Sequence, residues 1–430
     1  MSSPRDCHAA LTKFLASRND QIYDIHFLPD GFGDLLHEGN EIGISKKTLV
    51  QCFIKARQIF FNLPIETVTQ DSKSSNQQRS APEIQIQHDT PHTTYPAILD
   101  DSQTTHLLLQ TEILLLLDTE HLTACNWRKR RICALQERQS QCPTTTTTTT
   151  SSSPTSTNQY LAALHSEIAF TTTILRSPLH RHTKSPVLWF HRKWVMTQLL
   201  DVYSDALIVA FAGSHHLPEY DVSKTAESSS SAAIEHIINY EVSIVLQAGA
   251  HHPKNYYAFS YLREFMGLFA NALAQGGKRS IRLQDLAKSV VETVHTWCLT
   301  YSRRRDISAW SFLLWLLEAM GDGDDNEDAS ELCKIVIDKT AHLGEELSWE
   351  GEGLWIFVDL AASRFGVDVE WLMKHALEKD KTAQQPTIGD DDANVDVTAL
   401  SHKRWKLWVN RMEAAQNWGS TVVVANDDPS

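Results

Sequence analysis

The sequence contains no apolar run long enough to cross a lipid bilayer. Its longest run of large aliphatic residues, ILLLL, covers only residues 113–117, whereas a membrane-spanning helix needs about 20 apolar residues. The N-terminal segment MSSPRDCHAALTKFLASRND lacks the hydrophobic stretch of an export signal, and the C-terminal NDDPS lacks a prenylation motif. We therefore expect a cytoplasmic protein without a membrane span.

The chain also lacks a surplus of positive charge, closely spaced cysteines and any familiar catalytic motif. Its 39 Lys and Arg face 53 Asp and Glu, a formal net charge of −14, so we expect no nucleic-acid partner. The 7 cysteines include no Cys-x-x-Cys pair, which favours reduced thiols. The 20 histidines show no metal-ligand spacing, so we expect no metal site. No P-loop, dinucleotide loop or nucleophile elbow is present, which disfavours catalysis by this chain alone.

Strand-type alternation is scarce as well, and apolar residues instead recur three and four positions apart. LAALHSEIAFTTTIL (residues 161–175) and AIEHIINYEVSIVLQAG (233–249) are examples. This spacing is typical of amphipathic helices and predicts an all-α fold.

Polar, low-complexity segments separate the helical stretches. Such compositions bury too little apolar surface to offset the entropy of ordering a backbone, so we expect mobile inserts there. The predicted organisation is N-terminal helices at 1–64, a disordered insert at 65–104, helical repeats at 105–372 with a low-complexity insert at 140–158, a linker at 381–398, a C-terminal helix at 399–418 and a disordered tail at 419–430.

Five segments of the chain align on one large or apolar residue, which we call the anchor. The positions three, seven and ten residues after each anchor are also mostly apolar, and these offsets share one face of a helix. Each of the five helices should therefore bury the same stripe. The anchors are Cys125, Trp189, Phe259, Trp310 and Trp355.

The residue four positions before each anchor indicates where its helix begins. Ser185, Asn255 and Asp306 occupy this position in three segments and are strong N-cap residues, while Gly351 is a weaker cap. The first segment has His121 there, which breaks the rule. Each anchored helix also has a helical partner upstream, so we expect antiparallel helical hairpins stacked into an α-α superhelix, a solenoid with a concave face.

These segments resemble the α-subunit repeat of protein prenyltransferases, whose helix opens with Asn-Tyr-x-x-Trp-x-x-Arg. KNYYAF (residues 254–259) and LWFHRKW (188–194) carry the similarity most clearly, and TACNWRKR (123–130) is similar to the first repeat. SPVLW and SAWSFL bring the chain nearest to the branch of α-subunit repeat-containing proteins. The complete Trp-x-x-Arg occurs only at Trp189 and Arg192.

The resemblance implies a crescent that wraps a separate β-subunit, with zinc and the isoprenoid diphosphate held by that β-subunit and no cofactor in this chain. By the same resemblance Lys254 matches a lysine near the diphosphate, and Tyr256 the tyrosine beside it. A positioned ammonium would stabilise the negative charge of the departing diphosphate. Arg128, Trp189, Arg192, Asn255, Phe259, Trp310 and Trp355 are expected to be structural residues of the repeat.

The residues themselves leave simpler interpretations open. Lys254 is equally compatible with a solvated lysine before a helix, and Tyr256 with ordinary packing. Arg128 and Arg192 are best explained as structural bonds to a neighbouring helix end. We expect the α-subunit of a heterodimeric protein prenyltransferase, paired with a Rab-type β-subunit and supporting geranylgeranyl transfer to a Cys-terminal protein substrate. The alternatives are a non-enzymatic helical-repeat scaffold and, as a weaker third, a stand-alone enzyme.

Overall fold

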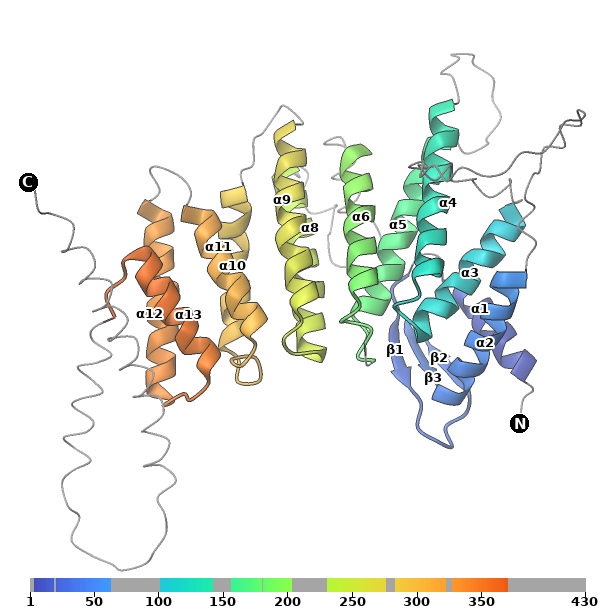
Figure 1. Ribbon diagram of the computed structural model, residues 1–430, viewed down its shortest axis with the longest axis horizontal. Coiled ribbons are helices and arrows are strands. Elements are labelled where there is room, and N and C mark those ends of the chain that lie inside the picture. Colours follow the sequence, from blue (N-terminus) through green and yellow to red (C-terminus); the bar gives the residue numbers. More distant parts are fainter. Residues whose placement is uncertain are drawn as a thin grey trace, which may run out of the picture. The chain divides into compact units, whose positions relative to one another are not determined.

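The computed structural model describes residues 4–18, 21–62, 101–141, 156–179, 181–202, 230–275, 283–321 and 327–369. These residues form twelve helices and three short strands, so the described chain is mostly helical. It divides into two compact units, Met1–Leu199 and Leu200–Ser430, whose elements are labelled in Figure 1.

Within its described residues, the first unit begins with a helix and a small sheet and continues with helices (Figure 1). Its helices pack in sequence order, with α2 against α3, α3 against α4 and α4 against α5. The elements are α1 (Pro4–Ala16), β1 (Asp24–Phe27), β2 (Leu35–Glu38), β3 (Glu41–Ile44), α2 (Lys46–Asn62), α3 (Asp101–Leu117), α4 (Leu122–Gln141), α5 (Ser156–Leu175) and the start of α6 (Pro186–Val202).

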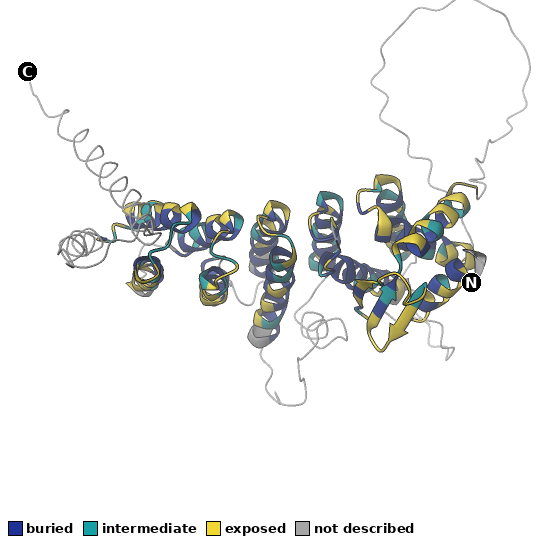
Figure 2. Cartoon of the chain, turned by 90° about the horizontal axis from the view of Figure 1, so that it is seen from below, coloured by how far each residue is buried: buried dark blue, intermediate teal, exposed yellow. Residues whose placement is uncertain are grey.

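In its described residues from Ser230 onward, the second unit contains three helical hairpins in two layers. The first helices of the hairpins, α8, α10 and α12, contact one another in one layer, and α9, α11 and α13 do so in the other. Figure 2 shows buried residues along the facing sides of these helices and exposed residues on the outer faces. The elements are α8 (Ser230–His251), α9 (Tyr256–Gln275), α10 (Leu283–Leu299), α11 (Ile307–Gly321), α12 (Glu327–Glu346) and α13 (Glu352–Phe365).

All five anchored helices begin one residue after the predicted cap position, at Leu122, Pro186, Tyr256, Ile307 and Glu352. The capping groups are as expected in three of them. Ser185 Oγ accepts from the Leu188 N–H at 3.2 Å, Asn255 Oδ1 from Ala258 N–H at 3.3 Å, and Asp306 Oδ1 from Ser308 and Ala309 N–H at 3.0 and 3.2 Å.

His121 corrects the expectation that the first segment lacks a cap. Its imidazole Nδ1 accepts a hydrogen bond from the Ala124 N–H at 3.2 Å, the same geometry that a Ser or Asn side chain provides. A histidine with an unprotonated Nδ1 can do this because that nitrogen has a free lone pair. At the fifth segment, Gly351 makes no side-chain cap.

The predicted stripe is buried in every repeat. The five anchors are at most 2% exposed, and the residues three positions later are fully buried. Leu135 and Phe365, ten positions after the first and last anchors, are only partly covered, so the stripe frays at the far ends of α4 and α13. The residues three positions after the anchors are Arg128, Arg192, Leu262, Leu313 and Val358.

Each tryptophan anchor makes a second, recurring contact. Its indole Nε1–H donates to the backbone carbonyl of the residue six positions earlier, in the loop that precedes the helix. A buried indole N–H needs such a partner, so each bond fixes the path of that loop against its helix. The pairs are Trp189 with Thr183 at 2.8 Å, Trp310 with Arg304 at 2.8 Å and Trp355 with Trp349 at 2.6 Å.

The all-α prediction is wrong between α1 and α2, where residues 24–44 form a three-stranded sheet. Its strand order is β1-β3-β2, with β1 parallel and β2 antiparallel to β3. Each strand has only 4 residues, too few to show a clear alternation. The turn signals were present, however: Gly39 and Asn40 join β2 to β3, and two such residues are a strong hairpin signal.

The predicted segment boundaries need adjustment where helices extend into supposed inserts. Helix α3 starts at Asp101, inside the expected insert at 65–104, and α5 starts at Ser156, inside the insert at 140–158. The linker at 381–398, the C-terminal helix at 399–418 and the tail at 419–430 lie outside the described residues. Among the described helices, none combines the length and apolar character needed to span a membrane.

The backbone of α12 approaches the anchor Trp355 closely at Gly344. A Cβ at Gly344 of α12 would lie 2.8 Å from the Trp355 indole, whereas a Cβ at Gly267 of α9 would meet nothing within 4 Å. Gly344→Ala should therefore lower the free energy of unfolding by about 1–3 kcal/mol, despite the better helix propensity of alanine. The control Gly267→Ala should raise it by up to about 1 kcal/mol. Urea unfolding would contradict this account of the packing if both variants shifted in the same direction.

Candidate functional site at the repeat helix starts

Lys254 lies in the loop between α8 and α9, directly before the N-cap Asn255. Its backbone has φ of +63°, the left-handed region that side chains with a Cβ seldom adopt. The Lys254 N–H donates to Asp306 Oδ2 at 2.9 Å, which holds the main chain in place, while the residue is exposed. The loop therefore fixes the backbone and leaves the residue open to solvent.

Asp306 has two roles at once. One carboxylate oxygen caps α11, and the other accepts the N–H of Lys254 from the neighbouring hairpin. Burial raises the pKa of the Asp306 carboxyl, an effect that the hydrogen bonds from Lys254, Ala309 and Ser308 partly offset. A single buried side chain thus sets both the start of α11 and the conformation of the preceding loop.

Tyr256 and Tyr257 open helix α9 beside Lys254. Tyr256 is 66% exposed and Tyr257 is 38% exposed, and their rings make an edge contact with centroids 5.9 Å apart. In contrast, Asn255 is completely buried. The structure therefore brings Lys254 and Tyr256 together on an open surface, and it assigns Asn255 to the helix cap.

The link between neighbouring hairpins recurs in both units. In the first, His182 Nε2 bonds the carbonyl of Leu116 at 2.7 Å, and Ser185 Oγ donates to the carbonyl of Thr119 at 3.0 Å. In the second, Arg303 donates to the carbonyl of Ala250 at 3.0 Å. His182 and Arg303 both stand seven residues before their anchors, and both bond a carbonyl nine residues before the preceding anchor.

The side chain of His182 is suited to that bond because it is uncharged. Burial lowers its pKa to about 4, and the hydrogen bond to the Leu116 carbonyl counteracts only part of this effect. A neutral imidazole carries one N–H, which must lie on Nε2 to donate to the carbonyl. The imidazole of His182 is thus engaged in a contact between neighbouring hairpins.

Arg128 and Arg192 are completely buried, and each bonds a preceding helix: Arg128 the middle of α3, and Arg192 the C-terminal half of α5. Arg128 donates to the Leu108 carbonyl at 3.4 Å and to Thr111 Oγ1 at 3.0 Å. Arg192 repeats the arrangement on α5, where it donates to the Ile168 carbonyl at 3.2 Å and to the hydroxyls of Thr171 and Thr172, both at 2.9 Å. Both arginines thus bond a preceding helix through fully buried side chains.

Glu167 of α5 pairs with two side chains of other helices, Arg128 of α4 and His191 of α6. It forms a bidentate pair with Arg128, with both N···O distances at 2.9 Å, and it accepts from His191 Nε2 at 2.8 Å. Arg128 also lies over the Phe170 ring, 3.8 Å from its centroid. All of these side chains are completely buried, so α4, α5 and α6 are joined through one carboxylate.

Burial and charge act in opposite directions on this cluster. Burial alone would raise the pKa of Glu167, but the charge of Arg128 and the bonds from His191 and Arg128 hold it far below its usual value. Burial likewise would lower the pKa of His191, yet the Cys125 thiol and Glu167 raise it above 6.5. The arrangement stabilises a protonated His191 beside an ionised Glu167.

Neither Glu167 nor His191 was predicted from the sequence, and His182 had no predicted structural role. Glu167 carried no signal, because nothing in a helical pattern says which polar residue will face a buried arginine of another helix. A signal did exist for His182, since a long polar side chain recurs seven residues before the anchors at His182 and Arg303. Three further histidines, at positions 180, 215 and 216, lie outside the described residues.

The candidate residues do not all form one site. Lys254 and Tyr256 lie at the start of α9, together with Asp306 of the next hairpin, whereas Arg128 and Arg192 belong to the interior of the first unit. In the part of the chain that the structure describes, no group of three His, Cys, Asp or Glu residues is placed to hold a metal ion. No protein-family model matches the chain, and no curated protein matches it either.

The buried cluster predicts a defined pH dependence of stability. Because the folded-state pKa of His191 is raised, its contribution is complete below about pH 6.5 and is lost as pH rises through the folded-state value. The folded-state pKa of Glu167 is lowered, so the contribution of Glu167 to stability is complete above about pH 4.5 and is lost as pH falls below that value. His191→Gln should therefore lower the free energy of unfolding more at about pH 5.5 than at about pH 9.

The control is a double-mutant cycle measured by chemical unfolding at both pH values. In a Glu167→Gln background the carboxylate is gone, so His191→Gln should lose its extra cost at the lower pH. An equal pH dependence with and without Glu167 would show that the two side chains are not coupled.

Proposed function

We propose that this chain is the α-type subunit of a heterodimeric protein prenyltransferase. A β-subunit, of the Rab type, would carry zinc and the isoprenoid diphosphate and transfer a geranylgeranyl group to the C-terminal Cys of a protein substrate. We expect the chain to be inactive alone. The observation that carries the proposal is the arrangement of Lys254, with a fixed main chain and an exposed side chain.

A strained backbone at an exposed cation favours a functional role for Lys254. A non-glycine residue at positive φ costs roughly 1–2 kcal/mol, and such strain persists where the surroundings enforce it, often at ligand sites. Here Asp306 enforces it through the bond to the Lys254 N–H. The ammonium group would then face the negative charge that develops on a departing diphosphate.

The start of helix α9 supports the same anion. Tyr256 stands at the first helical position and is 66% exposed, so its hydroxyl is free to approach a phosphoryl oxygen. The free N–H groups of a helix start attract negative charge as well. Lys254, Tyr256 and the helix start would therefore act on the diphosphate of a neighbouring subunit together.

The helical repeats would serve assembly rather than chemistry. The caps and indole bonds hold each loop against its own helix, and loop-to-loop bonds join neighbouring hairpins. Together they would give a partner subunit a rigid surface. Such preorganisation lowers the entropic cost of association. In this role Arg128, Trp189, Arg192, Phe259, Trp310 and Trp355 act through packing alone.

The proposal is tested by co-expression of the full chain with a panel of prenyltransferase β-subunits, Rab-type subunits included. We expect a stable one-to-one complex by light scattering, and transfer of labelled geranylgeranyl diphosphate to a Cys-terminal acceptor that neither subunit supports alone. If no β-subunit forms a complex, the proposal fails and the scaffold alternative takes its place.

Replacement of Lys254 separates its chemical role from its structural role. Lys254→Gly removes the ammonium and also relieves the positive φ, so it should raise the free energy of unfolding by about 1 kcal/mol. In the complex the same variant should lower the turnover number by about tenfold or more. The exposed Lys334 of α12 gives the control, because Lys334→Ala should leave turnover unchanged. Unaltered turnover in Lys254→Gly would return Lys254 to the solvated lysine of the simpler interpretation.

A non-enzymatic scaffold remains the second candidate, and one observation favours it. Large apolar side chains are exposed on adjacent helices α11 and α13, at Ile307, Ile356 and Leu360, with exposed fractions of 53%, 40% and 49%. Exposed apolar surface of this kind is typical of protein-interaction faces. It would suit a binding partner that performs no lipid transfer.

A further inference from the structure

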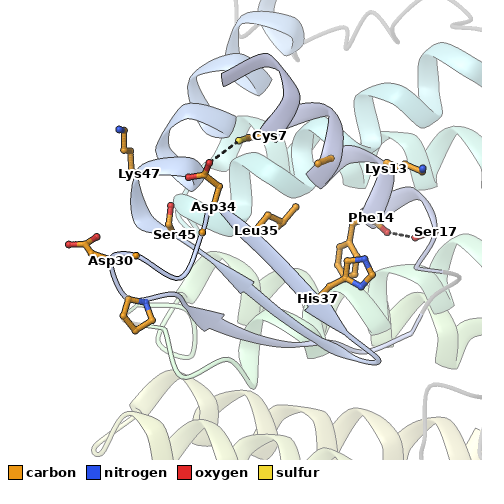
Figure 3. Close-up of a pocket in the computed structure, with 14 residues that line it drawn as sticks. Cys7, Lys13, Phe14, Ser17, Asp30, Asp34, Leu35, His37, Ser45 and Lys47 are labelled. Atoms are coloured by element: carbon orange, nitrogen blue, oxygen red, sulfur yellow. Dashed lines mark hydrogen bonds between the residues drawn. The ribbon is translucent and has the colours of Figure 1, made fainter. Parts of the chain in front are cut away.

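A cleft in the first unit lies between helix α1 and strand β2. It measures about 1000 Å³ and is open to solvent. Figure 3 shows Phe14 and His37 close together at one end and Asp30, Asp34 and Lys47 at the other, with Leu35 between the two ends. The cleft is therefore elongated along the strand.

Strand β2 forms one wall of the cleft and is an edge strand. The sheet order is β1-β3-β2, so β3 covers one side of β2, and no described strand pairs with the other side. The Ser45 N–H donates to the Asp34 carbonyl at 3.0 Å, and Leu36 lies opposite Gly43 two positions further along. In an antiparallel ladder such alternate residues bond inward, so the N–H and C=O groups of Leu35 and His37 point outward.

The side chains of those same two residues line the cleft. Leu35 and His37 lie opposite Ile44 and Ile42, which are buried, so all four share the inner face of the sheet. The His37 ring lies against Phe14 of α1, with centroids 5.2 Å apart. An extended chain along β2 could therefore gain main-chain bonds at the edge and place alternate side chains over an apolar floor.

The loop before β2, with Gly31, Gly33 and Asp34, lines one end of the cleft. Gly31 and Gly33 have φ of +95° and +100°, and a Cβ at either would meet nothing within 4 Å, so conformation rather than crowding requires glycine there. Asp34 faces the cleft but is already engaged, because it accepts from Thr48 Oγ1 at 3.0 Å and from Cys7 Sγ at 3.8 Å.

The opposite end of the cleft is basic. Lys13 is exposed there beside His37 and Ser17, whereas the loop end holds two carboxylates, Asp30 and Asp34, and one lysine, Lys47 (Figure 3). This distribution is complementary to an occupant with a negative charge at the Lys13 end. A polar edge, an apolar floor and one basic end together describe a site for an extended peptide.

We propose that the cleft between α1 and β2 binds an extended segment of a partner protein, which adds to the sheet as a fourth strand beside β2. The segment places an apolar side chain over Phe14 and Leu35 and an acidic side chain at Lys13. This surface is independent of Lys254 and of any β-subunit, so it holds whether the chain is a transferase subunit or a scaffold.

The test starts from selection of a displayed random decapeptide library on the full chain, followed by synthesis of the enriched peptides. We expect enriched sequences with an acidic residue near an apolar one. Methylation of single backbone nitrogens along such a peptide should weaken binding by about tenfold at every second position and by no more than about twofold between them. This period of two is the signature of strand addition.

Two substitutions locate the peptide on the protein. Lys13→Glu should weaken binding by about tenfold, whereas the charge-matched control Lys55→Glu, on an exposed part of α2 outside the cleft, should not. His37→Pro removes an outward N–H of an edge strand, where proline is tolerated, and should also weaken binding.

Three results would overturn the proposal. The first is an absence of enriched peptides, and the second is a methylation profile without alternation. The third is a concentration-dependent dimer of the chain that Lys13→Glu or His37→Pro abolishes, because the edge of β2 would then be covered by a second copy. If His37→Pro fails to fold, the methylation profile and the Lys13→Glu comparison still decide the outcome.

Discussion

The structure depends on how the polar groups at the start of each anchored helix are satisfied. The first N–H groups of a helix have no partner within it, and a large aromatic anchor brings an indole N–H into the core beside them. Ser185, Asn255, Asp306 and His121 supply the side-chain acceptors, while loop carbonyls accept the indoles six residues back. Each loop is thus bound to its own helix, and the stripe of buried side chains that follows can face a neighbour in one register only.

The same loops carry the bonds that join one hairpin to the next, so insertions are poorly tolerated within them. The carbonyls of Leu116, Thr119 and Ala250 accept bonds from the following hairpin, and the N–H of Lys254 donates one to it. A change of length within such a loop would move several bonded groups at once. The low-complexity stretches of the sequence fall instead between hairpins, and loop-closure entropy rises only slowly with length.

Local patterns predicted the helices well because the signals are local. A cap residue, an anchor and offsets of three, seven and ten residues lie within one helix, so the starts of α6, α9, α11 and α13 follow from the sequence alone. The contacts of Glu167 could not be predicted, since they depend on which faces of three helices meet. The sheet at residues 24–44 was missed for another reason: strands of 4 residues carry almost no periodicity, and the Gly39-Asn40 turn was the one usable signal. For Lys254 the sequence predicted a helix start but could not predict a left-handed backbone held by Asp306.

The position three residues after the anchor shows what the Trp-x-x-Arg pattern means physically. In the first unit this position holds Arg128 and Arg192, each paired with hydroxyls and a carbonyl of the preceding helix. In the second unit it holds Leu262, Leu313 and Val358, which are equally buried. Replacement of a buried polar network by packed aliphatic side chains is often neutral for stability, so both solutions build the same hairpin. The arginine therefore belongs to the packing of the repeat, and a resemblance based on it concerns the fold. The proposed role in prenyl transfer depends instead on Lys254 and Tyr256, which the packing leaves exposed.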